Sequence, residues 1–276
     1  MRIWQKLAAG VLVAVLVLWT VVLYVADRSE RSLRARIEGE SESFATALID
    51  EVDRRTLVRV AEWSAYVRSE EVQRRLRESN EAFAALPDRE RHIAETERRW
   101  DEASTELIDD PLSADLRARL EVHTKIAEYP IYPEVFLTNG FGVNIAQSGR
   151  TSDYLQSDEP WWNAAWEDGL FVGDVRIDES AGVRSTAICL RVDAQDGEKL
   201  GVLKVVLDIS DVQALLAARA RDDVRICLLT SDAQVVYDSR NPKRTEPANG
   251  TAAFGELLAR SERDRVGSSE QSDVES

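Results

Sequence analysis

The sequence is poor in the residues that build metal sites and disulfide frameworks. Its 276 residues include two cysteines, two histidines and one methionine. Cys189 and Cys227 lie in two separate strand-like apolar runs, so we expect two buried thiols rather than a disulfide. His92 and His123 lie far apart and without companion cysteines, which favours surface or packing positions over a metal site.

Basic charge and catalytic motifs are also scarce. The chain has 35 basic and 50 acidic residues and a net charge of −15, which argues against binding nucleic acid through its phosphates. There is no P-loop, no nucleophile elbow and no histidine near the candidate aspartates, so we expect neither an enzyme nor a cofactor. Hydrolysis by Asp178 and Asp208 as a carboxylate pair stays open, since sequence gives no distance between them.

Long apolar runs are limited to one, "LAAGVLVAVLVLWTVVLYVA" at residues 7–26. A helix of about 20 residues spans the ~30 Å hydrocarbon core of a bilayer. The run is longer than the apolar part of a typical signal peptide, and Tyr24 stands where cleavage needs a small residue. We therefore expect an uncleaved anchor, with residues 1–27 forming a cytoplasmic tip and a transmembrane helix. A cleaved signal peptide is the alternative.

The charges beside this run predict its orientation. Arg2, Lys6 and the amino terminus make the leading flank positive, whereas acids and bases balance on the following flank. The positive-inside rule then places everything after residue 26 outside the cytoplasm. The expected protein crosses the inner (cytoplasmic) membrane once and has a periplasmic or extracellular body.

Residues 28–128 have the pattern of a long helix followed by shorter helical segments. The first helix is expected to reach about residue 80, and residues 89–126 form further helices interrupted near Pro111. One apolar stripe runs along the long helix at Leu33, Ile37, Phe44, Leu48 and Val52. A helix this long needs a partner, so we expect a parallel homodimer along the stripe; a solvated single helix is the alternative.

Residues 129–210 change to short β-rich runs. Two runs flank the turn signal Asn139-Gly140, and three follow: "LFVGDV", residues 184–192 and residues 200–209. A short helix with three tryptophans lies between the second and third runs. Two strands, a helix and three strands predict an α+β lobe with a five-stranded antiparallel sheet, the order of a PAS-like lobe.

The edges of the tryptophan helix have their own signals. Ser157 or Asp158 is expected to cap it, Pro160 fits its first turn, and Gly169 ends it. Further along, residues 211–255 open a second, similar lobe that remains incomplete. It begins with a helix over residues 211–220 and continues with a strand, a bend and a strand. A short helical run and a polar tail, residues 256–276, follow.

Four stretches together resemble the double Cache (PDC-type) domains: "YPIYPEVFLTNGFG", "GRTSDYLQSDEPWWNAAW", "GDVRIDESAGV" and "GVLKVVLDIS". These domains are tandem PAS-like extracytoplasmic sensors of bacterial chemoreceptors, sensor kinases and cyclic-dinucleotide enzymes. The resemblance covers about residues 28–239. It implies that residues 129–210 are a membrane-distal lobe that binds a small molecule. The sequence departs from the family in its incomplete second lobe and in lacking a second span and an output domain, so we expect a separate signalling partner.

The pocket motif of double Cache lobes that bind amino acids also carries over. The resemblance implies ligand-binding side chains at Tyr154, Trp161, Trp162, Asp178 and Asp208. Two further pocket positions differ, since Glu159 replaces the arginine that holds a carboxylate and Arg176 replaces a tyrosine. Tryptophan faces attract cations and carboxylates bind ammonium groups, so the site is expected to take a cation or amine.

Packing competes with binding in this segment. On a helix Trp162 and Trp166 share one face, so we expect Trp166 in the core, Trp162 in core or pocket, and Trp161 in the pocket. Asp178 has the alternative of bonding the backbone of its own loop. The sequence thus predicts a membrane-anchored extracytoplasmic ligand sensor. The alternative is a coiled-coil scaffold whose degenerate lobe binds a protein partner.

Overall fold

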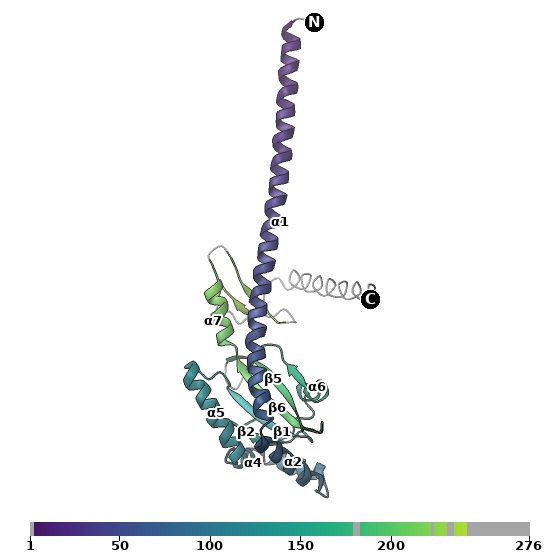
Figure 1. Ribbon diagram of the computed structural model, residues 1–276, viewed down its shortest axis with the longest axis vertical. Helices are drawn as coiled ribbons and strands as arrows, with labels where there is room; N and C mark the ends of the chain where they lie inside the picture. Colours follow the sequence, from purple (N-terminus) through teal and green to yellow (C-terminus); the bar gives the residue numbers. More distant parts are fainter. Residues whose placement is uncertain (1–2, 179–182, 222–223, 231–234, 242–276) are drawn as a thin grey trace. The chain divides into compact units, whose positions relative to one another are not determined.

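The computed structural model describes residues 3–178, 183–221, 224–230 and 235–241, without the side chains of residues 4–11, 13–14, 101, 177–178 and 183. The chain divides into two compact units, residues 1–57 and 58–276, and each is described by itself. Helix α1, Ile3–Val67, supplies all of the first unit that the structure describes and contributes its last turns to the second (Figure 1).

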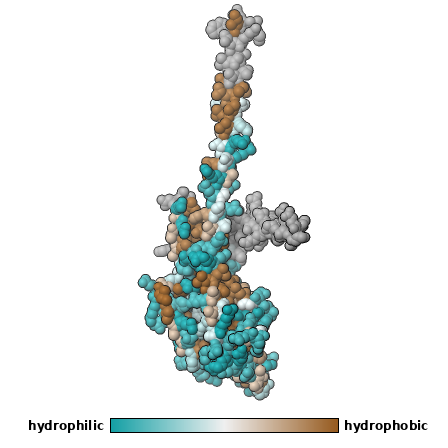
Figure 2. Space-filling view, in the orientation of Figure 1, coloured by the Kyte–Doolittle hydropathy of each residue, from teal (hydrophilic) through white to brown (hydrophobic). Residues whose placement is uncertain are grey.

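The described part of the first unit carries both apolar and charged surface. Beyond residue 26, ion pairs one helical turn apart stabilise the helix, as between Arg34 and Glu30 at 2.5 Å. Between residues 12 and 25 most of the described side chains are apolar and exposed, and Figure 2 shows hydrophobic residues along this stretch. The large exposed apolar residues between positions 12 and 25 are Leu12, Val15, Leu16, Val17, Leu18, Trp19, Val21, Val22, Leu23, Tyr24 and Val25.

Two expectations fall on this unit. Within the described residues, no helix combines the length and the apolar character that a membrane span requires. The side chains at 7–11 and 13–14 of the expected anchor lie outside that description. On the predicted dimer stripe, Leu33 and Ile37 are exposed, whereas Phe44, Leu48 and Val52 are half-buried; the homodimer remains a prediction.

The long helix ends earlier than the sequence pattern predicts. α1 ends at Val67, and Ser69, in an extended conformation with ψ 144°, begins a new helix. The later helices match the expected interruptions, because Asp110 accepts a hydrogen bond from the backbone N–H of Leu112 and Pro111 occupies the first turn of the next helix. The helices after α1 are α2 (Glu70–Ala84), α3 (Arg89–Arg98), α4 (Trp100–Ile108) and α5 (Pro111–Ala127).

An antiparallel sheet forms the centre of the second unit, as predicted. Its strands are β1 (Glu134–Asn139), β2 (Asn144–Gln147), β3 (Leu170–Val172), β4 (Arg176–Asp178), β5 (Val183–Asp193) and β6 (Lys199–Asp208). Their order is β2-β1-β6-β5-β3, and β4 also pairs with β5. Of the predicted third strand, residues 170–175, only β3 forms; the N–H of Gly173 then bonds the carbonyl of Ala187, and β4 is an additional strand after the predicted run. Figure 1 shows β1, β6 and β5 in the middle of the domain.

The tryptophan helix is α6, Pro160–Asp168, between β2 and β3. Its N-cap residue is Glu159, whose side chain makes no capping bond, so the expectation of a cap from Ser157 or Asp158 is wrong. Gly169 ends the helix with φ +87°, a conformation that favours glycine. At the β5–β6 turn Gly197 has φ +88°, and the predicted hairpin forms.

One face of the sheet packs against helices. β6 places Leu203, Val205 and Leu207 on this face, and the last turns of α1 cover it together with α2 and α5. Trp63 is 2% exposed there, and Leu76 is fully buried. We call this the core face.

The segment that the sequence predicts to open a second lobe is described in part. It contains α7 (Ser210–Arg219), β7 (Cys227–Leu229) and β8 (Val235–Asp238), and the two strands pair antiparallel. The expected bend at Ser231-Asp232, the later helical run and the polar tail lie outside the described residues. Cys189 and Cys227 are free thiols; Cys189 is buried as predicted, whereas Cys227 is half-buried.

Candidate functional site

The opposite face of the sheet lies against α6, and we call it the α6 face. Strand alternation places Val202, Lys204, Val206 and Asp208 of β6 on this face, because their neighbours Leu203, Val205 and Leu207 point into the core. The core face is apolar on β6. The α6 face of the same strand carries two charged residues.

Trp162 and Trp166 form the packed part of the α6 face. Trp162 is 5% exposed, and its Nε1 donates a hydrogen bond to Oγ1 of Thr138 at 2.8 Å. The Trp166 ring is half-buried and stacks on Trp162, with centroids 4.9 Å apart and planes at 13°. Trp162 is thus the more deeply packed of the two, although its burial is compatible with either predicted role. The Nζ of Lys199 lies 5.3 Å from the Trp166 ring.

Trp161 lies apart from that stack. It is half-buried, and its ring meets Phe136 edge to face at 5.9 Å and 80°. The ammonium group of Lys204 lies 4.5 Å from the Trp161 ring centroid and 5.3 Å from that of Phe136. The chain's own lysine therefore occupies the position beside the tryptophan where a cationic ligand group was expected.

Sequence reasoning missed Lys204. The signal that was available is the period of two in "GVLKVVLD", which places Lys204 on the same face as Asp208. In the sheet Lys204 lies between Phe136 of β1 and Cys189 of β5. Burial raises the pKa of the Cys189 thiol to about 12, and the nearby charge of Lys204 opposes this rise.

Asp208 ends β6 and is 4% exposed. Its Oδ1 accepts a hydrogen bond from the backbone N–H of Ser210 at 2.6 Å, at the start of α7. Asp208 therefore has a structural contact whether or not it binds a ligand. Burial raises the pKa of the neighbouring Tyr129, and the negative charges of Asp211 and Asp208 add to this rise.

Tyr154 belongs to another cluster, at the β2 edge. Its ring lies 5.2 Å from Trp100 of α4, and both pack with Phe83 and Val143. Its backbone N–H donates to Oε1 of Glu97 at 3.0 Å. Burial raises the pKa of Tyr154 to about 12, with a further contribution from the Glu97 charge. The structure thus assigns Tyr154 and Trp161 to two different hydrophobic clusters.

The remaining predicted site residues lie near the ends of elements. Glu159 is half-buried before α6. Arg176 is exposed on β4 opposite Ser185 of β5. The backbone of Asp178 pairs with Val183; its side chain, and with it the predicted ligand or loop contact, lies outside the described residues.

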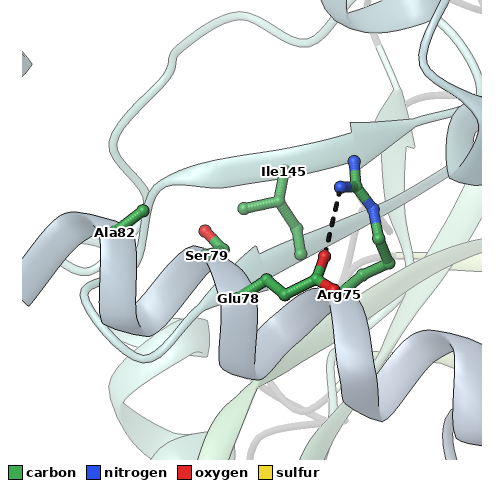
Figure 3. A pocket seen from close by; sticks show the side chains of 5 residues that line it. All are labelled: Arg75, Glu78, Ser79, Ala82 and Ile145. Carbon is green, nitrogen blue, oxygen red and sulfur yellow. Dashed lines mark ion pairs between the residues drawn. The ribbon is translucent and has the colours of Figure 1, made fainter.

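Three cavities lined by described residues lie elsewhere. One, of about 470 Å³, is bordered by Trp100, Tyr154 and the acids Glu106, Asp109 and Asp110. A second, of about 370 Å³, lies between α2 and β2, where Arg75 pairs with Glu78 across 3.6 Å beside Ile145 (Figure 3). The third, of about 630 Å³, is bordered by charged residues of α2 and the β5–β6 turn. Trp161 and Asp208 border none of these three.

Both histidines occupy packing positions, as expected. His92 meets the Phe83 ring edge to face. His123 of α5 contacts Glu62 of α1, with 2.5 Å between Nε2 and Oε1, and the same carboxylate accepts a hydrogen bond from the Tyr132 hydroxyl at 3.0 Å. This contact joins the end of α1 to α5 within the second unit.

Comparison with known proteins finds likeness at the level of structure. No family model and no curated protein sequence matches the chain. Among solved structures, the extracellular domain of rpHK1S-Z16 is similar with a TM-score of 0.41 and 14% identity, over 72% of this chain and 77% of that one. The ligand-binding domain of the Campylobacter jejuni chemoreceptor Tlp3, in complex with L-valine, has a TM-score of 0.37 and 17% identity over 72% and 77%. The ligand-binding domain of the Pseudomonas aeruginosa amino acid chemoreceptor PctC, in complex with GABA, has a TM-score of 0.33 and 18% identity, over 50% of this chain and 64% of that one.

Proposed function

We propose that this chain is a membrane-anchored extracytoplasmic sensor that binds a small molecule on the α6 face and passes the signal to a separate partner. The observation that carries the proposal is the placement of Lys204, Asp208 and the half-buried Trp161 on one face of the sheet, where Val202 and Val206 of the same strand are buried. Charged groups on a buried sheet face are costly when they serve packing alone, so their presence favours a binding role.

Two further features support a sensor. The strands and α6 follow the PAS-like connectivity that the sequence predicts, with α6 between the second and third strands. The motifs that resemble double Cache domains run through this lobe, residues 129–210, and residues 211–255 are proposed as the start of a second lobe. The ligand contacts proposed for this face are Glu159, Trp161, Trp162, Arg176, Asp178 and Asp208, and the proposed ligand group is an amine, received by the carboxylates. Tyr154, the seventh contact proposed from the sequence, packs with Trp100 in another cluster, outside this face.

A ligand screen tests the binding site. The full chain in detergent micelles is screened by thermal shift against amines, amino acids and dicarboxylates. A hit is expected to be lost in Trp161→Ala, whose melting temperature stays close to that of the parent protein, and largely kept in Trp161→Phe. If the hits bind Trp161→Ala and the parent protein equally well, binding occurs elsewhere. If nothing in the panel binds and a protein partner does, the scaffold alternative replaces the sensor.

The membrane anchor is supported by the uncharged run at residues 7–26 and by the exposed apolar residues between Leu12 and Val25. The positive flank predicts a body outside the cytoplasm. A reporter that is active only in the cytoplasm, fused after Ser276, is expected to stay silent. The same reporter fused before Met1 is the matched control and is expected to be active. Activity of the fusion after Ser276 would contradict the orientation.

A parallel homodimer along the stripe of α1 completes the proposal. The stripe starts at Leu33, and two of its described residues remain exposed in the single chain. In a Cys227→Ser background, cysteine at Ile37 or Phe44 is expected to crosslink in membranes several times more than cysteine at Glu40 or Glu42. Equal crosslinking at all four positions would show that no defined interface exists.

A further inference from the structure

We propose that Lys204 is the anion-binding residue of the α6 face and receives a carboxylate of the ligand. This inference rests on the proposed function, because it concerns the same face of the sheet. Lys204 lies on β6, the third strand of the order β2-β1-β6-β5-β3, and therefore has a strand on each side. It is opposite Phe136 on one neighbour and Cys189 on the other.

The residues directly beside Lys204 on its face are apolar, and the acid Glu134 of β1 lies on the same face opposite Val206. Along β6 the nearest residues on the same face, Val202 and Val206, are 0% and 5% exposed. Lys204 is half-buried, so its ammonium group is partly removed from water, which is costly unless a partner compensates. The rings of Trp161 and Phe136 compensate only in part, since such contacts contribute about 0.5–2 kcal/mol.

Within the part of the chain that the structure describes, no carboxylate forms an ion pair with Lys204. The strand offers a direct comparison in Lys199. That lysine also lies over a tryptophan of α6, Trp166, at 5.3 Å, but its Nζ has an acid partner in Glu167 at 3.6 Å. Both lysines lie on β6 and contact a tryptophan of α6, but only Lys199 has an acid partner. An anion from outside the chain would give Lys204 the partner that Lys199 already has.

The position also explains how the site holds an anion without the expected arginine. Glu159 stands where that arginine was looked for, at the start of α6. Lys204 supplies a positive charge from β6 on the same face, beside the Trp161 ring. The ligand class therefore includes a carboxylate, and the rings of Trp161 and Phe136 take up its apolar part.

The direct test observes the lysine itself. The lysines are Lys6, Lys125, Lys199, Lys204 and Lys243. The full chain in micelles is reductively ¹³C-methylated, the lysine signals are assigned with Lys204→Arg and Lys199→Arg, and acetate is titrated with the neutral acetamide as control. The Lys204 signal is expected to shift saturably with acetate and to stay unchanged with acetamide, while the Lys199 signal stays unchanged with both. The proposal is overturned if the Lys204 signal, like that of Lys199, does not shift with acetate. It is also overturned if the Lys204 signal shifts equally with acetate and acetamide.

Binding by variants separates this inference from the proposed function. For carboxylate hits of the ligand screen, Lys204→Met is expected to weaken binding about tenfold or more, whereas Lys204→Arg and the control Lys199→Met retain it. If Lys204→Met binds the hits as the parent protein does while Trp161→Ala has lost them, Lys204 only packs against the rings and the sensor function stands. If acetate moves the Lys204 signal but Trp161→Ala keeps every hit, the anion site stands and the proposed binding face is wrong.

Discussion

The two faces of one sheet are built differently. The core face is covered by α1, α2 and α5, and its residues on β6 are apolar without exception from Leu203 to Leu207 at every second position. The α6 face is covered by a short helix and retains Lys204 and Asp208 between buried valines. A strand contributes to both faces at once, so β6 presents an entirely apolar surface on one side and charged residues on the other.

Trp63 tests the core face with one of the two largest expected effects. It is 2% exposed and contacts Tyr66 and Tyr132 edge to face. Trp63→Ala is expected to lower the free energy of unfolding by about 3–5 kcal/mol, because a large buried ring leaves a cavity. Denaturant unfolding measures this value. Leu57→Ala, at a residue that is 62% exposed, is the control and should change stability by less than about 0.5 kcal/mol.

Trp162 tests whether the α6 face also holds the domain together. Trp162→Ala is expected to cost about 3–5 kcal/mol, because the ring is buried and the Thr138 hydroxyl loses its donor. Trp162→Phe should recover part of that loss, but the Thr138 hydroxyl would still lack the hydrogen bond that Trp162 Nε1 donates. A cost near zero in chemical denaturation would mean that α6 contributes little to stability, and the contrast between the faces would become sharper.

Tyr154 adds a pH dependence at the β2 edge, outside both faces. Its pKa is raised from 10.0 to about 12, so the fold favours the protonated hydroxyl. This contribution to stability is complete below pH 10 and is lost as the pH rises from 10 to about 12, by up to about 2–3 kcal/mol. Tyr154→Phe is expected to flatten the decrease, as followed by urea unfolding at several pH values. Tyr24→Phe, at an exposed residue, should leave the curve unchanged.

Trp166 has the smallest expected effect on stability among the tryptophans tested by unfolding, which are Trp63, Trp162 and Trp166. It also corrects a ranking made from the sequence. The sequence pattern places Trp166 in the core, yet the residue is half-buried and covers Trp162. Trp166→Ala is therefore expected to cost about 1–2 kcal/mol, less than Trp162→Ala. If thermal and chemical unfolding both show a larger loss of stability for Trp166→Ala than for Trp162→Ala, Trp166 contributes more to the stability of the stack than Trp162 does.

Proline, glycine and aspartate signals in the sequence correctly predicted helix ends and a hairpin turn. Pro160 and Gly169 bound α6, Asp110-Pro111 separates α4 from α5, and Asp196-Gly197 marks the β5–β6 hairpin. The break between α1 and α2 was missed because no proline or glycine marks it. Strand β4 was missed because it has three residues and two of them, Arg176 and Asp178, are charged.

The site was predictable only in part. The order of motifs indicated α6 and the end of β6, and both border the α6 face. The lysine in the middle of β6 was overlooked, since a lone charged residue in a strand is usually solvated. The partner of Tyr154, Trp100, lies more than fifty residues away along the chain, and no local pattern predicts such a contact.

The end of α1 has a practical consequence for anyone who trims this protein. The helix is continuous from Ile3 to Val67, but Trp63, Tyr66 and Val67 belong to the hydrophobic core of the second unit. Glu62, just before them, holds His123 and Tyr132. A fragment that begins at α2 would lack the core residues Trp63, Tyr66 and Val67. The safe starting points lie upstream of Val58, inside the helix rather than after it.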